Sequence, residues 1–365
     1  MTTSAAPAKS ASPKFLLRHV GNMGDMIFIV PPVLSALKKT YPHCHITFVT
    51  SWGYKHTAGL LPPFNQTIWG QRNQSGHSLH LIMTNPHIDQ LVHWHDKKLS
   101  LNNRLCREDE RSFPTWSKAY YEQQVKSGTY DKVIELDFGL SATDNPITRA
   151  FQLSGLSLNN PLNYQIYFTD SDLQKAEALT AKFPQPRIVL LESLAHPSTR
   201  GWDPAKGKQL TAAIVKEYDV EPIWFGAKFN HFFLGQPLSL RENIATLRFC
   251  TVGIGVLSGP LHFAAAAGLP TITLYCDHPL RRAAPAFFQN PTLPDTAVKH
   301  RTILGPHRFP MTILKGGTAS LSLTPAELAT QNFTHWSNPG RQSTKSGLAV
   351  ITVDEVMTVL NDMLK

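Results

Sequence analysis

The sequence predicts an α/β protein made of two doubly wound, mostly parallel sheets. Short apolar runs typical of buried strands alternate with helical segments in both halves of the chain. This alternation starts within residues 15–37 and starts again at 187–192, directly after the proline-rich stretch 183–186. Two such sheets joined by a proline-rich linker predict two Rossmann-like domains with a cleft between them.

The first domain is organised around a strand, a glycine-bearing turn and a helix. Phe15-Leu16-Leu17 predicts a buried strand, Gly21 and Gly24 end it, and Asp25 stands where the next helix should begin. Asp25 has two interpretations. It is either an N-cap that accepts hydrogen bonds from the first helical amides, or a catalytic base or ligand contact at the carboxyl ends of the strands. The Gly-x-x-Gly spacing does not match the Gly-x-Gly-x-x-Gly of dinucleotide sites.

Size and composition indicate a core-forming protein with more than one domain. The chain has 365 residues, of which 42% are hydrophobic and 17% charged. A net charge of +9 suits anionic partners such as phosphates or anionic lipid headgroups. No long Lys/Arg run and no nucleic-acid-binding motif is visible, so we expect no nucleic acid partner.

The cysteines and the N-terminal residues predict the compartment. The four cysteines form no Cys-x-x-Cys pair, which argues against a structural zinc site and a disulfide framework and favours a reducing compartment. Residues 1–14 lack an apolar centre and predict a disordered tail rather than a signal peptide. No apolar run approaches the roughly 20 residues of a spanning helix. We therefore expect a cytoplasmic protein that contacts the anionic inner face of the cytoplasmic membrane at most peripherally.

The remaining elements follow from the same periodicity. The first domain is expected over 15–183, the second over 187–348, and a C-terminal helix over 349–365, with Thr352 as N-cap and Glu355 as the capping-box acid. Within 62–128 we expect one or two strands and long loops, whose aromatic and basic side chains either face a substrate or are packing and solvated charge. Elsewhere we predict strands at 45–50, 130–137, 187–192, 221–226, 251–256 and 271–275, and helices at 147–153, 172–182, 208–218 and 260–268.

A second informative stretch runs from Gly253 to Pro270. A strand ends at Val256, and Ser258-Gly259-Pro260 turns directly into a helix with proline at its first turn. The amides of such a helix start, together with the serine hydroxyl, suit a phosphate or diphosphate. An ordinary strand–turn–helix without a ligand is the alternative.

A third stretch, residues 192–204, is rich in hydroxyls and follows the first strand of the second domain. Arg200 could neutralise a diphosphate leaving group with its fork of donors. In the structural interpretation, Ser198 and Thr199 are loop residues and Trp202 anchors the loop on the core.

These stretches carry a family resemblance. Residues 15–37 are similar to the N-terminal motif of glycosyltransferase family 9, the ADP-heptose:lipopolysaccharide heptosyltransferases and their relatives. Residues 253–270 resemble the second signature of that family, 192–202 its loop that ends in a basic residue, a spacer and Trp, and 351–356 the start of its terminal helix. The four matches occur in the expected order, although 62–128 and 277–348 have no clear match.

The resemblance implies a GT-B fold and an inverting, metal-independent glycosyltransferase without a cofactor. It would move a heptose-like sugar from a nucleotide-diphosphate sugar to a hydroxyl of a glycan, glycolipid or lipopolysaccharide-type acceptor. The first domain would lie on the acceptor side and the second would bind the nucleotide sugar. Asp25 would be the general base, and Arg200 would stand where the family has a lysine that stabilises the departing diphosphate. The donor and phosphate site would comprise Gly24, Ser198, Thr199, Ser258, Gly259, Pro260, Leu261, His262 and Asn230, with no amide from Pro260.

Two departures from the family pattern fall on donor recognition. Leu257 stands where the second signature usually has an acid, and the segment after Gly226 lacks the usual ribose-binding acid, for which Asn230 is a weak substitute. The alternative function is therefore a non-catalytic or divergent sugar-nucleotide-binding protein on the same fold. A sugar-nucleotide epimerase is a third hypothesis.

Overall fold

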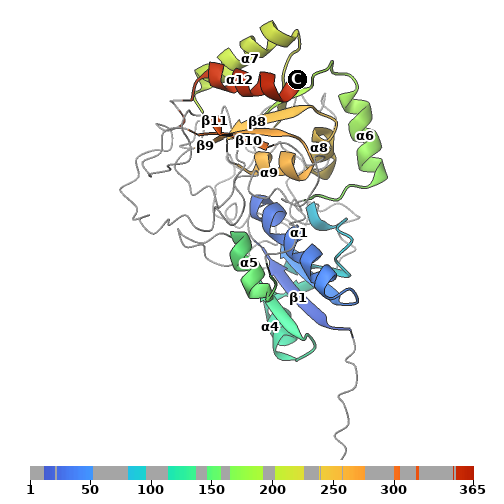
Figure 1. Cartoon of the computed structure of the whole chain (residues 1–365). Coiled ribbons are helices and arrows are strands. Elements are labelled where there is room, and N and C mark those ends of the chain that lie inside the picture. The colour runs from blue at the N-terminus through green and yellow to red at the C-terminus, as the bar shows by residue number, and fades with distance from the viewer. Residues whose placement is uncertain are drawn as a thin grey trace, which may run out of the picture.

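Two parallel sheets form the framework of the chain, one in each of two lobes (Figure 1). The first lobe is the five-stranded sheet with helices α1, α4 and α5; the second is the six-stranded sheet with helices α6 to α9 and α12. Within the described residues, no helix is both long and apolar enough to cross a membrane. This computed structural model describes residues 12–20, 23–51, 81–95, 114–136, 146–157, 165–191, 202–225, 238, 240–256, 258–275, 300–304, 318–319, 348 and 351–365.

The first sheet is entirely parallel, in the order β4-β3-β2-β1-β5. The strands predicted at 15–17, 45–50 and 130–137 are confirmed, the last in shortened form, and the region 62–128 contributes two strands. Helix α4 was not predicted, because Tyr121 is its one buried residue and its apolar periodicity is weak. The strands are β1 Lys14–His19, β2 His45–Ser51, β3 Gln90–His95, β4 Thr115–Ser117 and β5 Lys132–Glu135.

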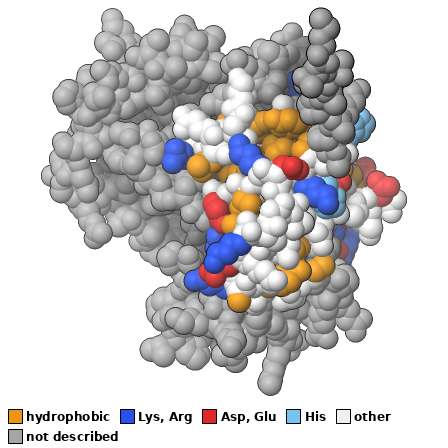
Figure 2. Space-filling view, turned by 90° about the horizontal axis from the view of Figure 1, so that it is seen from below, with side chains coloured by type: hydrophobic (Ala, Val, Ile, Leu, Met, Phe, Trp, Pro, Cys, Tyr) orange, Lys and Arg blue, Asp and Glu red, His pale blue; other side chains and the backbone are white. Residues whose placement is uncertain are grey.

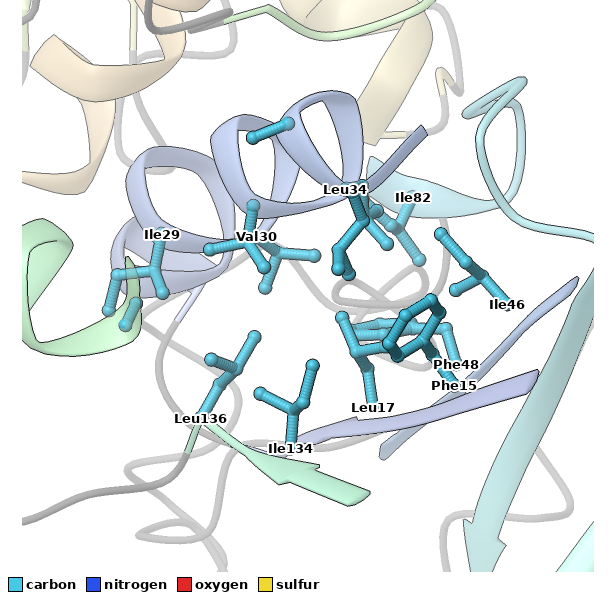
Figure 3. Packing of buried hydrophobic residues seen from close by; sticks show 14 of the residues in the cluster. Phe15, Leu17, Ile29, Val30, Leu34, Ile46, Phe48, Ile82, Ile134 and Leu136 are labelled. Carbon is cyan, nitrogen blue, oxygen red and sulfur yellow. The ribbon is translucent and has the colours of Figure 1, made fainter. Parts of the chain in front are cut away.

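Helices cover both faces of the first sheet. Helices α1 (Met23–Thr40) and α5 (Pro146–Ser154) pack on one face, where Val30 and Leu34 of α1 lie over apolar strand residues such as Leu17 and Phe48 (Figure 3). Helix α4 (Lys118–Lys126) covers the opposite face through Tyr121. Helix α1 continues through two internal prolines, although proline removes a helical hydrogen bond. Its face is apolar throughout, so the burial of that face holds the helix together.

The second sheet is parallel except at one edge. Its order is β11-β10-β9-β8-β6-β7, and only the β10–β11 pair runs antiparallel among the described strands. The four predicted strands are confirmed, whereas β10 and β11 were not predicted. The strands are β6 Ile188–Leu191, β7 Ile223–Phe225, β8 Val252–Val256, β9 Thr271–Tyr275, β10 His300–Leu304 and β11 Thr318–Ala319.

Five described helices flank this sheet. Helices α7 (Pro204–Tyr218) and α12 (Val353–Leu364) pack on one face. Helices α6 (Asp170–Thr180), α8 (Leu240–Leu247) and α9 (Gly259–Ala266) pack on the other face. Helix α9 lies between the sheet and the first lobe (Figure 1). The capping box predicted at Thr352 and Glu355 of α12 is present. Helix α8 was not predicted from its short sequence.

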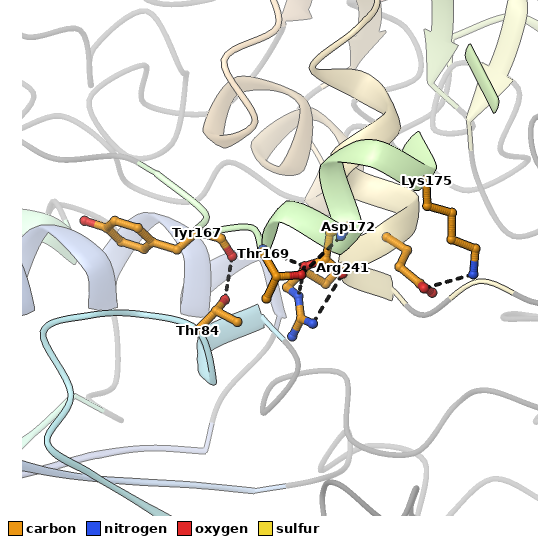
Figure 4. Close-up of polar contacts among 7 residues, drawn as sticks. Thr84, Tyr167, Thr169, Asp172, Lys175 and Arg241 are labelled. Atoms are coloured by element: carbon orange, nitrogen blue, oxygen red, sulfur yellow. Dashed lines mark hydrogen bonds and ion pairs between the residues drawn. The ribbon is translucent and has the colours of Figure 1, made fainter. Parts of the chain in front are cut away.

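An extended crossover, residues 165–169, connects the two lobes and contacts both. The Thr84 hydroxyl of the first lobe donates to the Tyr167 carbonyl oxygen (2.5 Å) (Figure 4). The Ile166 amide donates to the carbonyl oxygen of Ala266 in α9 (3.2 Å). Helix α6 follows directly and packs on α8 of the second lobe, and Ile166 and Leu179 join the apolar cluster of that lobe. Helix α6 therefore belongs with the second lobe by its contacts, while the domain boundary predicted at 183–187 stays a prediction.

A buried ion pair holds α6 against α8. The Asp172 carboxylate accepts hydrogen bonds from Arg241 Nε (2.7 Å) and Nη2 (3.3 Å), and from the Thr169 amide and hydroxyl (2.8 and 2.7 Å) (Figure 4). Burial opposes ionisation of Asp172, but the hydrogen bonds from Arg241 and Thr169 outweigh it and lower the pKa of Asp172 below its usual value. The charged pair is thus the ordinary state of this contact.

We expect Asp172→Ala to lower the free energy of unfolding by about 3–5 kcal/mol, because it leaves the Arg241 guanidinium buried without its counter-ion. Because the folded pKa is lowered, the contribution of Asp172 is present above pH 4 and is lost as the pH falls through the folded pKa. Urea denaturation at pH 7 and at pH 3 measures both effects. Lys175→Ala is the control, since its partly exposed pair with Glu242 (3.0 Å) should contribute at most about 1 kcal/mol. Equal losses in the two variants would contradict the assignment.

Candidate functional site

In each lobe, one strand stands where the strand order reverses. In the first sheet, β1 lies between β2 and β5; in the second, β6 lies between β7 and β8. Ligands of doubly wound sheets bind outside the carboxyl ends of the strands at such switch points. The segments that leave β1, β6 and β8 are therefore the candidates, and they carry the three stretches singled out in the sequence.

Asp25 lies in the first turn of α1, which follows β1. Helix α1 begins at Met23, so Gly24 and Asp25 are its second and third residues. Asp25 is thus inside the helix, and its interpretation as the N-cap residue is wrong. The partial positive charge of a helix start favours an acid at this position.

The start of α9 follows β8 through Ser258. Ser258 is the N-cap residue by backbone geometry (φ −165°, ψ 170°), but its hydroxyl donates to the Val256 carbonyl oxygen (3.0 Å) and does not cap the helix. The first amides of a helix have no acceptor within the helix, so the Gly259 and Leu261 amides can serve an anion. Pro260 contributes none. The predicted strand–turn–helix is confirmed; its role as a phosphate site stays a prediction.

The other predicted donor residues lie outside the described residues. These are Ser198, Thr199, Arg200 and Asn230, together with Leu257. The strand that precedes 192–200 is described, however, and β6 pairs directly with β8, so this segment and the start of α9 leave adjacent strands at the same edge. Trp202 is buried, and its Nε1 donates to the Ile351 carbonyl oxygen (3.2 Å). The structural interpretation of Trp202 as an anchor is confirmed.

Helices α1 and α9 bring the two lobes into direct contact (Figure 1). The ring of His262 lies against that of Phe28, with 4.9 Å between centroids and an interplanar angle of 30°. Ile27, one residue earlier in α1, belongs to the apolar cluster of the second lobe, which also contains Leu261. The His262 amide donates to the Ser258 carbonyl oxygen (3.2 Å) inside α9. The side chains of Leu261 and His262, both assigned to the phosphate site from sequence, therefore serve in packing.

The contact lies close to both helix starts along the chain. Asp25 precedes Phe28 by three residues, and Ser258 precedes His262 by four. Residues three or four apart share one face of a helix and lie about one turn, or 5.4 Å, apart along its axis. The two predicted functional positions therefore each lie one turn before the same interhelical contact.

A row of buried polar side chains crosses the carboxyl end of the first sheet and was not singled out from sequence. His19, Thr50 and His93 are register partners on adjacent strands and share one face. All three are buried, and His19 Nδ1 donates to the Leu136 carbonyl oxygen (3.2 Å). A polar residue in the second half of each strand was the available signal. Across the described ranges, no group of three or more His, Cys, Asp or Glu side chains could hold a metal ion.

Comparison with known proteins bears on the family. Residues 216–290, which include the start of α9, match the model of Glycosyltransferase family 9 (heptosyltransferase). The resemblance to glycosyltransferase family 9 is confirmed. The predicted enzyme class, a glycosyltransferase, agrees with this match. No curated protein matches the chain at a significant level.

Solved structures of family 9 proteins share the fold over nearly the whole chain. A family 9 glycosyl transferase from Veillonella parvula DSM 2008 superposes with a TM-score of 0.52 at 13% identity, covering 98% of each chain. ADP-heptose lps heptosyltransferase II from E. coli superposes with a TM-score of 0.50 at 13% identity, covering 96% of this chain and 98% of that one. The predicted α/β architecture of GT-B type is thereby confirmed.

Strand β8, which leads into α9, carries two glycines that differ in the space available for a side chain. A Cβ on Gly255 would lie 2.7 Å from Cδ1 and 2.9 Å from Cβ of Leu191, whereas one on Gly253 would meet chiefly the flexible end of Leu269, at 3.0 Å. We expect Gly255→Ala to lower the free energy of unfolding by about 1–3 kcal/mol, because strands β6 and β8 must separate. Gly253→Ala should cost less, since one methyl group can move. Thermal denaturation compares the two; a larger loss in Gly253→Ala would contradict this packing.

Burial lowers the pKa of His262 to about 3, so the imidazole is neutral where it meets Phe28. The unfolded chain takes up this proton near pH 6.5, so the stability from neutral His262 is present above pH 6.5 and is lost as the pH falls. We expect His262→Phe to remove a slope of about 1.4 kcal/mol per pH unit between pH 6 and pH 4. Urea denaturation of both proteins across this range measures the difference. Parallel pH profiles would contradict the buried, neutral state.

Proposed function

We propose that the protein is an inverting, metal-independent glycosyltransferase that moves a sugar from a nucleotide-diphosphate sugar to an acceptor hydroxyl. The observation that carries the proposal is the juxtaposition of two helix starts. One bears Asp25 and follows a switch-point strand of the first lobe. The other offers uncapped amides after a strand adjacent to the switch point of the second lobe.

Asp25 is proposed as the general base. The acceptor oxygen attacks the anomeric carbon of the sugar while its proton passes to the carboxylate, and the bond between that carbon and the diphosphate oxygen breaks. The nucleoside diphosphate leaves with the electron pair of this bond. Attack from the face opposite the leaving group inverts the anomeric configuration.

The second lobe is proposed to hold the leaving group. Amides at the start of α9 would bind diphosphate oxygens, with the partial positive charge of the helix end behind them. Arg200, in the segment after the adjacent strand β6, would neutralise the charge that develops on departure. Gly24, Ser198, Thr199 and Asn230 complete the proposed site. A base on one lobe and leaving-group stabilisation on the other need no bound metal.

The proposed donor and acceptor follow the solved relative whose name specifies them. The E. coli protein is an ADP-heptose lps heptosyltransferase, so we propose a heptose-like sugar and a glycan or lipopolysaccharide-type acceptor. Among the described side chains, Lys/Arg and Asp/Glu are interspersed on the face of the first lobe seen in Figure 2.

The alternative is a sugar-nucleotide-binding protein without transferase activity. The specific observation that favours it is Leu257, which stands between β8 and α9 where the family signature has an acid. Calorimetric titration with ADP-heptose, UDP-glucose, UDP-N-acetylglucosamine and GDP-mannose separates the two functions. Binding of one of these together with turnover supports the transferase; binding without turnover in the presence of acceptor glycans supports the alternative.

Asp25→Asn tests the base directly. Asparagine preserves the shape of the side chain, but it cannot accept the proton, so we expect kcat to fall by about 10²–10⁴-fold. Release of nucleoside diphosphate from the donor panel is the measurement, with the melting temperature recorded in parallel.

Asp203→Ala is the matched control for a purely structural acid. The Asp203 carboxylate accepts a hydrogen bond from the Ala205 amide (2.9 Å) at the start of α7. Its loss should cost about 1 kcal/mol of stability and leave kcat unchanged. If Asp25→Asn behaves like this control, losing stability but not turnover, Asp25 is not the base.

A further inference from the structure

Phe28 and His262 form the contact between the helix that carries Asp25 and the helix that starts at Ser258. Both side chains are buried, with 4% of their surface exposed, and their rings meet at 4.9 Å across the lobes. The side chain of Phe28 has no polar atom, and the proposed reaction assigns no step to either residue. Phe28 lies one helical turn after Asp25, and His262 lies one turn after Ser258. They can therefore affect how these two positions are placed.

We infer that Phe28 and His262 are positioning residues that set the separation between the general base and the diphosphate site. This role rests on the proposed function, because it concerns the distance between Asp25 and the start of α9. A shift of one helix along or away from the other moves the base relative to the leaving group. In-line displacement is sensitive to such shifts, and misplacement by about 1 Å can lower a rate about 10²-fold.

Three features make the contact suited to this task. First, Ile27 is buried in the apolar cluster of the second lobe while Phe28 belongs to that of the first, so α1 is packed from both sides. Second, α9 is a short helix of eight residues whose side chains from Leu261 to Ala266 are all buried, which leaves it little room to slide on its own sheet. Third, the crossover amide of Ile166 bonds to the Ala266 carbonyl oxygen at the opposite end of α9 (3.2 Å). Helix α9 is thus held near its start by the contact of His262 with Phe28 of the first lobe, and at its end by the hydrogen bond from the crossover.

The ring of His262, rather than its charge, makes this contact. The titratable and polar groups of α1 nearest in sequence to Phe28 are Asp25 and Lys38, and the residues between them are apolar apart from Ser35. Helix α9 carries no Asp, Glu, Lys or Arg, and His262 is its one titratable residue. A phenyl ring of similar size keeps this ring contact with Phe28, whereas alanine removes it.

The test is a set of three variants measured for turnover with the donor panel and for amide hydrogen exchange without ligand. We expect Phe28→Ala and His262→Ala to lower kcat by about 10–100-fold, with a smaller change in the KM for the donor. His262→Phe should retain most of the wild-type kcat. Amide protection should fall at the starts of both α1 and α9 in each alanine variant, although each variant alters one helix.

Phe48→Leu is the control. Phe48 is buried in the first lobe below α1 and away from α9 (Figure 3). This variant should lower the free energy of unfolding, because it removes buried atoms from the core. It should leave the amide exchange of α9 and kcat unchanged. If Phe28→Ala proves too unstable to purify, Phe28→Leu and the His262 pair supply the same comparison.

The outcomes separate this inference from the proposed function. A wild-type chain inactive with every donor overturns the proposed function and the positioning role with it. An active wild-type chain whose two alanine variants keep their kcat overturns the positioning role alone. The same holds if His262→Phe loses as much activity as His262→Ala, because the imidazole nitrogens would then be essential.

Discussion

The packing of α1 against α9 is the contact on which the arrangement of the molecule depends. Each helix covers the sheet of its own lobe, and each also presents apolar side chains to the other lobe. Because the contact lies one turn behind the helix starts, it aligns the carboxyl-end edges of the two sheets. A two-lobed fold can place a base and an anion site on separate sheets only if such a contact holds the sheets in a defined relation.

Apolar and polar buried side chains occupy different parts of the first lobe. Apolar residues fill the space between α1 and the strands, as with Leu17, Phe48 and Ile134 (Figure 3). Buried polar side chains gather toward the carboxyl ends of these strands, as with His19, Thr50 and His93, although Thr47 is buried nearer the start of β2. Buried polar groups cost free energy unless they are hydrogen-bonded, so their concentration at this edge sets it apart from the rest of the core.

Much of the fold could be predicted from the sequence because buried parallel strands are continuous apolar runs. Strands such as Ile188–Leu191 and Val252–Val256 are buried on both faces, so their sequences are continuously apolar and do not alternate with polar residues. Helices α4 and α8 could not be predicted in this way. The first is mostly exposed, and the second is only eight residues long. The edge strands β4 and β11 are two or three residues long and carry almost no pattern.

The candidate site was predictable where it depends on local sequence and not where it depends on contacts between lobes. The turn after β8 and the acid in the first turn of α1 follow from glycine, serine and proline chemistry over a few residues. The stacking of Phe28 on His262 joins positions far apart in the chain, and neither residue stands out in its own segment. His262 was assigned to the ligand because its neighbours suit an anion, whereas its burial against α1 could be seen only in three dimensions.

The crossover at 165–169 limits how these lobes can be recombined. Alternate residues of the crossover contact different lobes. Ile166 and Phe168 pack with the second lobe. Tyr167 contacts the first lobe, because its carbonyl oxygen accepts from the Thr84 hydroxyl and its own hydroxyl lies 3.1 Å from Nε2 of His87. A chimaera that takes its second lobe from a relative would have to include α6 and match the residues on both sides of this segment. An exchange made instead at the proline-rich stretch after α6 would separate α6 from α8, on which it packs.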